Sequence, residues 1–370
     1  MKIAVFSDTH LGYARFESDS YSQAERAVDS ASERADLILC AGDIFDTKIP
    51  KLETLKRAVE IFRRAKVPVF AIYGNHERRP KDEVNPAQLL ALSANFKLLH
   101  MECGVFEKDG EKVQVLGIGS VPEEYAEIAV KRAMGKFTKL DNAFTILMIH
   151  QSIKELTPGG SDELTLESLE ASPFDLIVDG HIHDTTVKLD GRFLIPGSTV
   201  MTQLKESETK GKGYFLYDTK TRKAEFVAIS SRPFFYENLD FKGAGIEEVR
   251  SRVTERIKQV RNANPDAIIA IKIDGTLKEG LSSSDLKIEE SDGVFIDNRL
   301  NVQSLGVRLA KIRENQDAIL STKELALKEL ERKTAGKITL FDSSELFEKL
   351  VAGPEETLAY LEGRNKKDAR

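Results

Sequence analysis

The sequence predicts an α/β protein in which a sheet rich in parallel strands is continued or covered by a second, mixed sheet, with helices outside. Up to residue 179, short apolar runs alternate with polar stretches of helical period, as in repeated βαβ units. Most of these runs lack polar alternation, which is typical of parallel strands buried on both faces. Beyond that point the apolar runs follow one another across tight turns, which indicates antiparallel strands.

The first strand–helix repeats are the clearest part of the pattern. Residues 2–6, 36–41 and 69–73 are apolar and are expected to be strands. Residues 21–34 and 52–66, which lie between them, have helical character. Each of the three strands stops at a polar segment that contains aspartate, asparagine or histidine.

The next part of the chain continues this alternation. Residues 86–95 and 123–134 are predicted helices, and residues 105–118 are a predicted hairpin centred on an Asp-Gly pair. Residues 144–149 and 176–178 are further buried strands. The antiparallel strands expected after them are 186–189, 193–195, 214–217 and 225–229.

The composition sets limits on the class of protein. The chain has 370 residues, 41% hydrophobic and 31% charged, with no apolar run that could span a bilayer and no signal peptide at its start. Its net charge is −6, so a polyanionic partner must meet a local basic patch or bound metal. Cys40 and Cys103 are too few for a disulfide framework, which favours a reducing cytoplasm and a role as small core residues.

Metal-binding side chains gather at the ends of the predicted strands. Five of the six histidines lie there; His100 is the exception. In open α/β sheets, ligands bind beyond the carboxyl ends of the strands. Polar residues also collect where strands meet loops, but that explains only one or two of these positions. The candidate ligands are Asp8, His10, Asp43, Asn75, His150, His181 and His183.

The types of these side chains indicate the metal. Carboxylate, imidazole and amide oxygen donors suit manganese, iron or zinc, and the lack of thiolates argues against a structural zinc site. Seven ligands are too many for one ion, so two ions sharing a carboxylate are expected. Such pairs lie about 3.5–4 Å apart and act on both the attacking and the leaving oxygen of a phosphoryl displacement.

Five motifs, in this order, resemble the signature of the calcineurin-like binuclear metallophosphoesterases. They are Asp8-x-His10, Gly42-Asp43, Gly74-Asn75-His76-Glu77, His150 and Gly180-His181-x-His183. The resemblance implies that family's fold, a two-sheet sandwich flanked by helices (αββα). It also implies that Asp43 bridges the two ions.

The same resemblance distributes the remaining roles. One ion would be completed by Asp8, His10 and His183. The other would be completed by Asn75, His150 and His181. His76, which is next to a ligand but is not one, would be catalytic: it would stabilise the attack or protonate the leaving alkoxide.

A narrower resemblance covers residues 1–232. The segments His10-Leu11-Gly12-Tyr13, Gly42 to Thr47, and Pro196-Gly197-Ser198 followed by Gly213-Tyr214 resemble the double-strand-break repair nucleases of the meiotic-recombination-eleven family, called SbcD in bacteria. By that resemblance Tyr13 is a candidate DNA contact. Many members have histidine where this chain has Asp46, so a second catalytic histidine is not assigned, and Asp46 is expected to position a ligand or cap the following turn.

The family implies an activity and partners. The activity is manganese-dependent cleavage of DNA, as a 3′-to-5′ exonuclease and a single-strand endonuclease, with two Mn(II) ions per chain. The partner is an SMC-like ABC ATPase of the Rad-fifty or SbcC type. A homodimer is also implied, through residues 21–34 or 52–66. The location would be the cytoplasm, at the nucleoid in a prokaryote.

The last third predicts two further parts. Residues 233–302 form a small α/β unit where the family has its DNA-capping domain. Its basic residues, such as Arg250 and Lys258, are either a DNA-facing edge or a solvated helix face. Residues 303–363 contain short amphipathic helices, at 307–320, 321–333 and 343–351, that either bind the ATPase or pack on the chain itself; residues 364–370 are a polar tail.

Two other functions remain open at this stage. One is a small-molecule phosphodiesterase or phosphatase on the same scaffold. The phosphoprotein phosphatases, however, place an arginine after the second aspartate, where this chain has Thr47 and Lys48 after Asp46. The other is a non-catalytic adaptor, a class that tends to lose metal ligands, whereas this chain has the full set.

Overall fold

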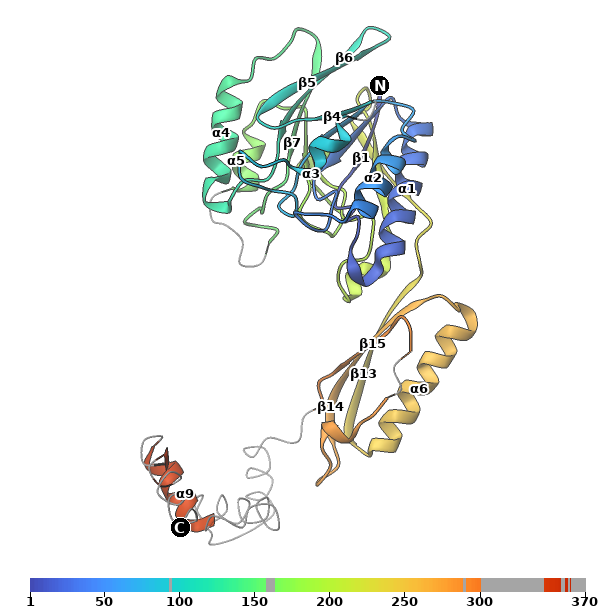
Figure 1. Cartoon of the computed structure of the whole chain (residues 1–370), viewed down its shortest axis with the longest axis vertical. Coiled ribbons are helices and arrows are strands. Elements are labelled where there is room, and N and C mark those ends of the chain that lie inside the picture. The colour runs from blue at the N-terminus through green and yellow to red at the C-terminus, as the bar shows by residue number, and fades with distance from the viewer. Residues whose placement is uncertain are drawn as a thin grey trace. The chain divides into compact units, whose positions relative to one another are not determined.

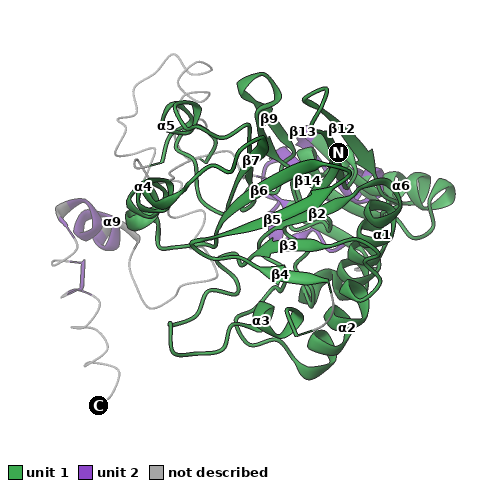
Figure 2. Ribbon diagram, turned by 90° about the horizontal axis from the view of Figure 1, so that it is seen from above, with its two compact units in different colours: residues 1–239, 253–272, 289–297 green, residues 240–252, 273–288, 298–370 purple. Residues whose placement is uncertain are grey.

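The computed structural model describes residues 1–92, 95–157, 164–288, 291–300 and 343–353, together with 357, 358 and 360. The chain divides into two compact units, which Figure 2 colours separately. The first comprises Met1–Leu239, Val253–Lys272 and Glu289–Asp297, and the second comprises Asp240–Arg252, Ile273–Ile288 and Asn298–Arg370. The helices predicted at 307–320 and 321–333, and the tail at 364–370, lie outside the described residues. The predicted domain boundaries stay an expectation.

Two six-stranded mixed sheets form the centre of the first unit (Figure 1). The first sheet has the order β12-β11-β1-β2-β3-β4, with β12 at Lys223–Ala228, β11 at Gly213–Asp218, β1 at Lys2–Phe6, β2 at Leu37–Ala41, β3 at Val69–Ile72 and β4 at Phe96–Leu98. The second has the order β5-β6-β7-β8-β10-β9, with β5 at Glu102–Lys108, β6 at Glu111–Ile118, β7 at Ala143–Ile149, β8 at Leu176–Asp179, β10 at Phe193–Ile195 and β9 at Thr186–Lys188.

The sheets pack face to face, and helices cover their outer faces. Alternate residues of β1 and β2, such as Val5 and Leu39, meet Ile146 and Val178 of the second sheet in one buried cluster. The other faces carry α1 (Glu17–Arg34), α2 (Leu52–Phe62) and α3 (Pro86–Leu90) on the first sheet, and α4 (Ala126–Lys136) and α5 (Leu166–Glu170) on the second. Figures 1 and 2 both show these two helix groups on opposite sides. The predicted αββα sandwich is confirmed.

Parallel pairing places the carboxyl ends of the strands that precede the predicted ligands at the same edge of each sheet. β1, β2 and β3 are parallel neighbours, with Phe6 paired to Cys40 and Cys40 to Ala71. β7 and β8 are parallel neighbours in the other sheet, with Ile149 paired to Asp179. The residues that follow these five strands therefore emerge together.

The predicted helices differ from the observed ones mainly at their ends. α1 begins earlier than predicted, because the 3₁₀ turn Ala14–Phe16 leads directly into it. α3 begins as predicted, where Asn85 caps the helix and Pro86 is its first residue, but it ends at Leu90, before β4. The predicted hairpin is confirmed: β5 and β6 pair across Asp109 and Gly110, both with positive φ.

The predicted elements of the capping region are present. β13 (Phe234–Ala244), β14 (Ile268–Leu277) and β15 (Val294–Asn298) form a three-stranded sheet. α6 (Ile246–Ala263) follows β13, and its residues Val249, Val253 and Val260 are buried. The last predicted helix is observed as α9 (Ser343–Ala352). Among the described residues, no helix is both long and apolar enough to cross a membrane.

Candidate metal centre

The seven predicted ligands and His76 converge on one place from five strand ends. Asp8 and His10 follow β1, Asp43 follows β2, and Asn75 and His76 follow β3, all in the first sheet. The second sheet supplies three histidines. They are His150 after β7, and His181 and His183 after β8. The site is therefore built by both sheets together.

Three glycines allow this convergence because a side chain at any of them would collide with the site. A Cβ added at Gly42 would lie 2.5 Å from His150 Nδ1. One at Gly74 would lie 2.0 Å from Asp43 Oδ1, and one at Gly180 would lie 2.1 Å from the carbonyl oxygen of Ala41. These glycines are required for the close approach of the strand ends.

Four of the donor residues have left-handed backbone conformations. φ is 52° at Asp8, 41° at His10, 48° at Asp43 and 71° at His181. Such conformations are unfavourable for residues with a Cβ, typically by about 1–3 kcal/mol each, and they collect at functional sites where the surrounding structure holds them. The sharp turns direct the side chains inward from the strand ends.

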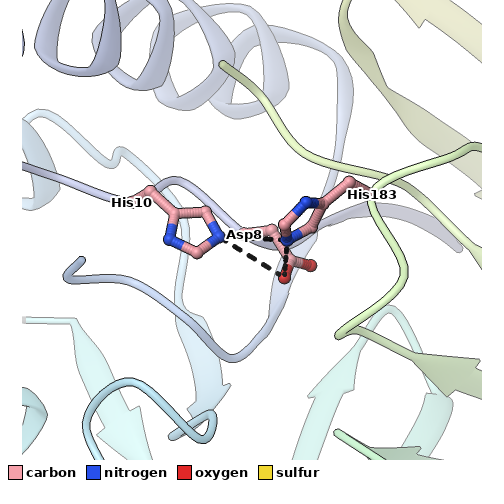
Figure 3. Close-up of side chains that lie close together, drawn as sticks. All are labelled: Asp8, His10 and His183. Atoms are coloured by element: carbon pink, nitrogen blue, oxygen red, sulfur yellow. Dashed lines mark hydrogen bonds and ion pairs between the residues drawn. The ribbon is translucent and has the colours of Figure 1, made fainter. Parts of the chain in front are cut away.

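Asp8, His10 and His183 form one group of donors, shown in Figure 3. His183 Nε2 lies 3.5 Å from Asp8 Oδ1, and His10 Nε2 lies 3.9 Å from the same oxygen. The two Nε2 atoms are 3.2 Å apart. The three side chains thus direct one oxygen and two nitrogens at a common point.

Asp43 is the centre of the whole arrangement. Its Oδ2 lies 3.3 Å from His150 Nε2, and 4.0 Å from Nε2 of both His10 and His76. Its Oδ1 accepts a hydrogen bond from the backbone N–H of His76. Asp43 therefore lies within 4.0 Å of histidines supplied by both sheets.

Asn75 connects the remaining two histidines. Its Oδ1 lies 3.1 Å from His150 Nε2 and 2.9 Å from His181 Nδ1. This brings an amide oxygen and two imidazole nitrogens together. The structure brings together every residue of the predicted ligand set.

In three of these histidines, a contact at Nδ1, the ring nitrogen that faces away from the site, fixes the orientation of the imidazole ring. His150 Nδ1 donates to the carbonyl oxygen of Ala41 at 2.7 Å, and His76 Nδ1 donates to that of Asp46 at 2.7 Å. His10 Nδ1 lies 3.2 Å from the Asp46 carboxylate, a contact that matches the predicted positioning role of Asp46. In each case Nε2 is left facing inward.

The residues fit a divalent cation. Both carboxylate oxygens of Asp8 are fully buried and have no hydrogen-bond partner within the described part of the chain. Burial alone would lower the pKa of His150, but the Asp43 carboxylate outweighs it and raises that pKa to about 10. Without metal, a proton thus supplies positive charge here, and donors of this kind suit manganese, iron or zinc.

Several supporting residues carried no clear signal in the sequence. Glu77 is fully buried and accepts hydrogen bonds from the backbone of Phe45 and Gly74; burial and the nearby Asp43 raise its pKa to about 8. It belongs to the motif that includes Asn75, which was the only available hint. Ser152 Oγ lies 3.0 Å from His181 Nε2 and donates to Glu123.

Two other predicted residues lie at the margin of the site. The Tyr13 ring centroid is 6.5 Å from that of His10, and the Tyr13 hydroxyl donates to the carbonyl oxygen of Thr202. A cavity of about 540 Å³ lies beside Asn75 and His181 and is also lined by Arg78 and Glu123. His100 lies outside the site, where its Nε2 is 3.1 Å from the Tyr73 hydroxyl.

The fold and the donor set together define a metallophosphoesterase. Residues 1–222 match the calcineurin-like phosphoesterase superfamily domain, and the chain belongs to that superfamily. It is a metal-dependent phosphodiesterase, a hydrolase, as the sequence predicted.

Within the superfamily, the chain is similar to proteins described as DNA double-strand break repair protein Mre11. The one from Archaeoglobus fulgidus is 28% identical, over 85% of this chain and 74% of its own length. Those from Thermoplasma acidophilum and Methanococcus maripaludis are 26% and 25% identical and are covered over 90% and 97% of their lengths. The predicted resemblance to the Mre11 and SbcD family is confirmed.

Replacement of Gly180 tests the close approach at the centre of the site. Gly180→Ala is expected to displace His150 and to weaken binding of Mn(II) at least tenfold, because the new Cβ would meet both Ala41 and His150. Isothermal titration calorimetry with Mn(II) measures this change. Gly135→Ala in α4 is the matched control: a Cβ there meets nothing within 4 Å, and metal affinity should not change. Equal affinities in the two variants would contradict this account of Gly180.

Proposed function

We propose that this chain is a manganese-dependent DNA nuclease of double-strand-break repair, with 3′-to-5′ exonuclease and single-strand endonuclease activity. The observation that supports the proposal best is the convergence of seven oxygen and nitrogen donors around Asp43. The names of the similar proteins support the choice of DNA repair over other phosphoester substrates. The complete donor set makes a non-catalytic adaptor a poor description of this chain.

The residues around Asp43 would hold two Mn(II) ions, one with Asp8, His10 and His183 and one with Asn75, His150 and His181. When bound, such a pair of ions polarises a phosphodiester and supplies a water of lowered pKa for in-line attack. Asp43 would be shared, since its carboxylate lies between the two groups.

His76 is suited to act on the substrate rather than to hold metal. Its side chain is 36% exposed, whereas those of His10 and His150 are buried. Because its Nδ1 donates to the Asp46 carbonyl oxygen, Nε2 is the nitrogen left for the substrate. When protonated, Nε2 can stabilise the charge that develops on the phosphate or give its proton to the leaving alkoxide.

DNA would be held by groups around the metal centre. Tyr13, next to His10, is the contact that we propose on the nuclease domain. In the predicted capping domain, Arg250 is paired with Glu247 and Arg252 lies over the Phe241 ring at 5.2 Å. These contacts indicate that the two arginines belong to a solvated helix face or have a structural role. Lysines of the predicted capping domain, such as Lys258, are therefore the better candidates for contacts with DNA phosphates.

Cleavage of end-labelled duplex and hairpin DNA tests the activity directly. With Mn(II) we expect shortening of the duplex and nicking of the hairpin loop, at rates well above those for bis-nitrophenyl phosphate. His76→Ala should keep metal affinity and lose about 10²–10⁴-fold in turnover, because it removes a general acid and no ligand. Asp8→Ala should instead lose metal, which metal analysis of the purified protein detects.

Two results would contradict the function, and a third would contradict only the role of His76. Rapid turnover of the small ester with no cleavage of DNA would favour the small-molecule phosphodiesterase. No hydrolysis of either substrate would favour the adaptor. Unchanged turnover in His76→Ala would remove His76 from the mechanism while leaving the metal centre in place.

A homodimer is also proposed, and we propose as its contact surface a patch formed by the exposed apolar residues at and near the ends of α2 and α3. Leu52 and Leu92 are 79% and 84% exposed, and Ile49 and Val84 are 74% and 62% exposed. α2 and α3 contact each other, and Figure 2 shows them side by side. Leu52 is the first residue of α2, Ile49 precedes that helix, and Val84 and Leu92 flank α3 in the sequence. Exposed apolar groups of this kind are typical of a subunit contact.

Charge placed in this patch should separate the subunits. Leu52→Glu combined with Leu92→Glu is expected to yield monomers in sedimentation velocity at concentrations where the original chain is dimeric, because it introduces unpaired charges into the contact. Val187→Glu, at a 47% exposed position on β9, is the control and should stay dimeric. A doubly substituted chain that still sediments as a dimer would place the contact elsewhere.

We propose that the C-terminal helices bind an SMC-like ABC ATPase, and that the chain acts at the nucleoid in the cytoplasm. α9 supports this proposal because Leu350 and Val351 on it are 52% and 66% exposed, and Leu358 beyond it is 59% exposed. An amphipathic helix with an uncovered apolar face is suited to a groove on a partner.

Co-elution measures this association. The original chain should elute together with the ATPase, and Leu350→Glu combined with Val351→Glu should reduce the co-eluting fraction at least tenfold, because charge replaces the apolar contact. Val187→Glu again serves as the control. An ATPase that elutes alone from a mixture with the original chain would contradict the complex.

A further inference from the structure

His183 differs from His10, His76 and His150 in what holds the ring nitrogen that faces away from the site. His10, His76 and His150 are each fixed by a carboxylate or a carbonyl oxygen, groups that only accept hydrogen bonds. The Nδ1 atom of His183 instead lies 2.6 Å from the hydroxyl oxygen of Thr202. A hydroxyl can donate or accept, so Thr202 by itself does not decide which nitrogen of His183 carries the hydrogen.

The residue behind Thr202 removes this ambiguity. Thr202 Oγ1 donates to Glu208 Oε1 at 3.3 Å. The other carboxylate oxygen of Glu208 is in an ion pair with Lys212. Lys212 also donates to Ser198 Oγ at 2.8 Å, and Ser198 Oγ donates to the carbonyl oxygen of Val200.

The Glu208–Lys212 pair is buried, which is unusual for charged residues. The side chain of Glu208 is 0% exposed and that of Lys212 is 8% exposed. Burial lowers the pKa of Lys212, and the adjacent Glu208 carboxylate opposes that change. Buried ion pairs carry a large desolvation penalty and often add little to stability, so this pair calls for another role.

The positions of the hydrogens follow from these contacts. Glu208, held by Lys212, can only accept, and the single hydroxyl hydrogen of Thr202 therefore points to it. The lone pairs of Thr202 Oγ1 then face His183, whose Nδ1 must carry the hydrogen. Nε2 is left without one, directed at Asp8 Oδ1 and His10 Nε2.

We propose that Thr202, Glu208 and Lys212 form a positioning relay that holds His183 in its Nδ1–H tautomer, ready to bind metal through Nε2. The proposal rests on the metal centre inferred above and adds residues that contact neither metal nor substrate. Without the relay, Thr202 could donate to Nδ1, and His183 would take the Nε2–H tautomer, which cannot bind a metal at that atom. Partners of this kind typically change metal affinity 10–100-fold.

Comparison of Thr202→Val with Thr202→Ser separates the effect of the Thr202 hydroxyl from the effect of the side chain's volume. Valine keeps the volume, removes the hydroxyl and leaves the Glu208–Lys212 pair intact, whereas serine retains the hydroxyl. The first measurement is nitrogen NMR of ¹⁵N-histidine-labelled, metal-free protein, with the His183 signals assigned by their loss in His183→Gln. The second is the affinity for Mn(II), from isothermal titration calorimetry.

We expect Thr202→Val to reduce the Nδ1–H population of His183 and to weaken Mn(II) binding 10–100-fold, with both effects absent in Thr202→Ser. Thr209→Val is the control: the Thr209 hydroxyl donates to the carbonyl oxygen of Glu206, away from the site, and neither measurement should change. Should Thr202→Val not fold, Glu208→Met combined with Lys212→Met replaces it. That double variant removes the ionised acceptor without leaving a buried charge unpaired, and the same shifts are expected.

Two outcomes overturn the proposal. One is an unchanged tautomer and affinity in Thr202→Val; the other is a loss in Thr202→Ser as large as that in Thr202→Val. Failure of the proposed function would look different, because the original chain would then not cleave DNA with Mn(II), or, if the metal centre itself failed, would bind no Mn(II). The tautomer measurement needs no metal and still reports on the relay in that case.

Discussion

The site depends on how closely the ends of β2, β3 and β8 can approach Asp43 and His150. Gly42, Gly74 and Gly180 lie at these ends, and their missing side chains let the backbones come within contact distance of the donors. The left-handed turns at Asp8 and Asp43 then direct each carboxylate inward. Packing of the two sheets holds these turns in place, so the sandwich core and the donor set form a single structural requirement.

The buried charges of the metal centre explain why it is suited to divalent cations. Asp8 and Asp43 are buried carboxylates whose repulsion must be balanced by positive charge. His150 gives part of that balance when protonated, and divalent cations would give all of it. His76 has the same neighbour in Asp43 yet remains partly open to solvent, which supports the proposal that it acts on the substrate and does not hold metal.

Sequence patterns predicted most of the fold and the inner part of the site, because both depend on local signals. Apolar runs marked the strands, and the parallel order of the first strands implied that Asp8 and Asp43 would lie at one edge of a sheet. The packing of the second sheet against the first brings His150 to them. Thr202, Glu208 and Lys212 could not be found in this way. They lie after the last ligand, Glu208 in the short 3₁₀ helix Glu206–Lys210 and the other two in irregular backbone, where no period relates sequence to position. The contact of Thr202 with His183, and those of Glu208 and Lys212 behind it, depend on three-dimensional packing. Helix ends such as that of α3 were also missed, since the path into β4 decides them.

The division of the donors between two sheets has a consequence for the lifetime of the chain. Asp8, Asp43 and Asn75 come from one sheet and His150, His181 and His183 from the other, so a bound cation fastens the two layers to each other. A ligand at one hundred times its dissociation constant adds about 2.7 kcal/mol to the stability of the folded form that binds it. Scarcity of the cation therefore leaves the same polypeptide easier to open and to degrade, which couples its abundance to the supply of metal as well as to its synthesis.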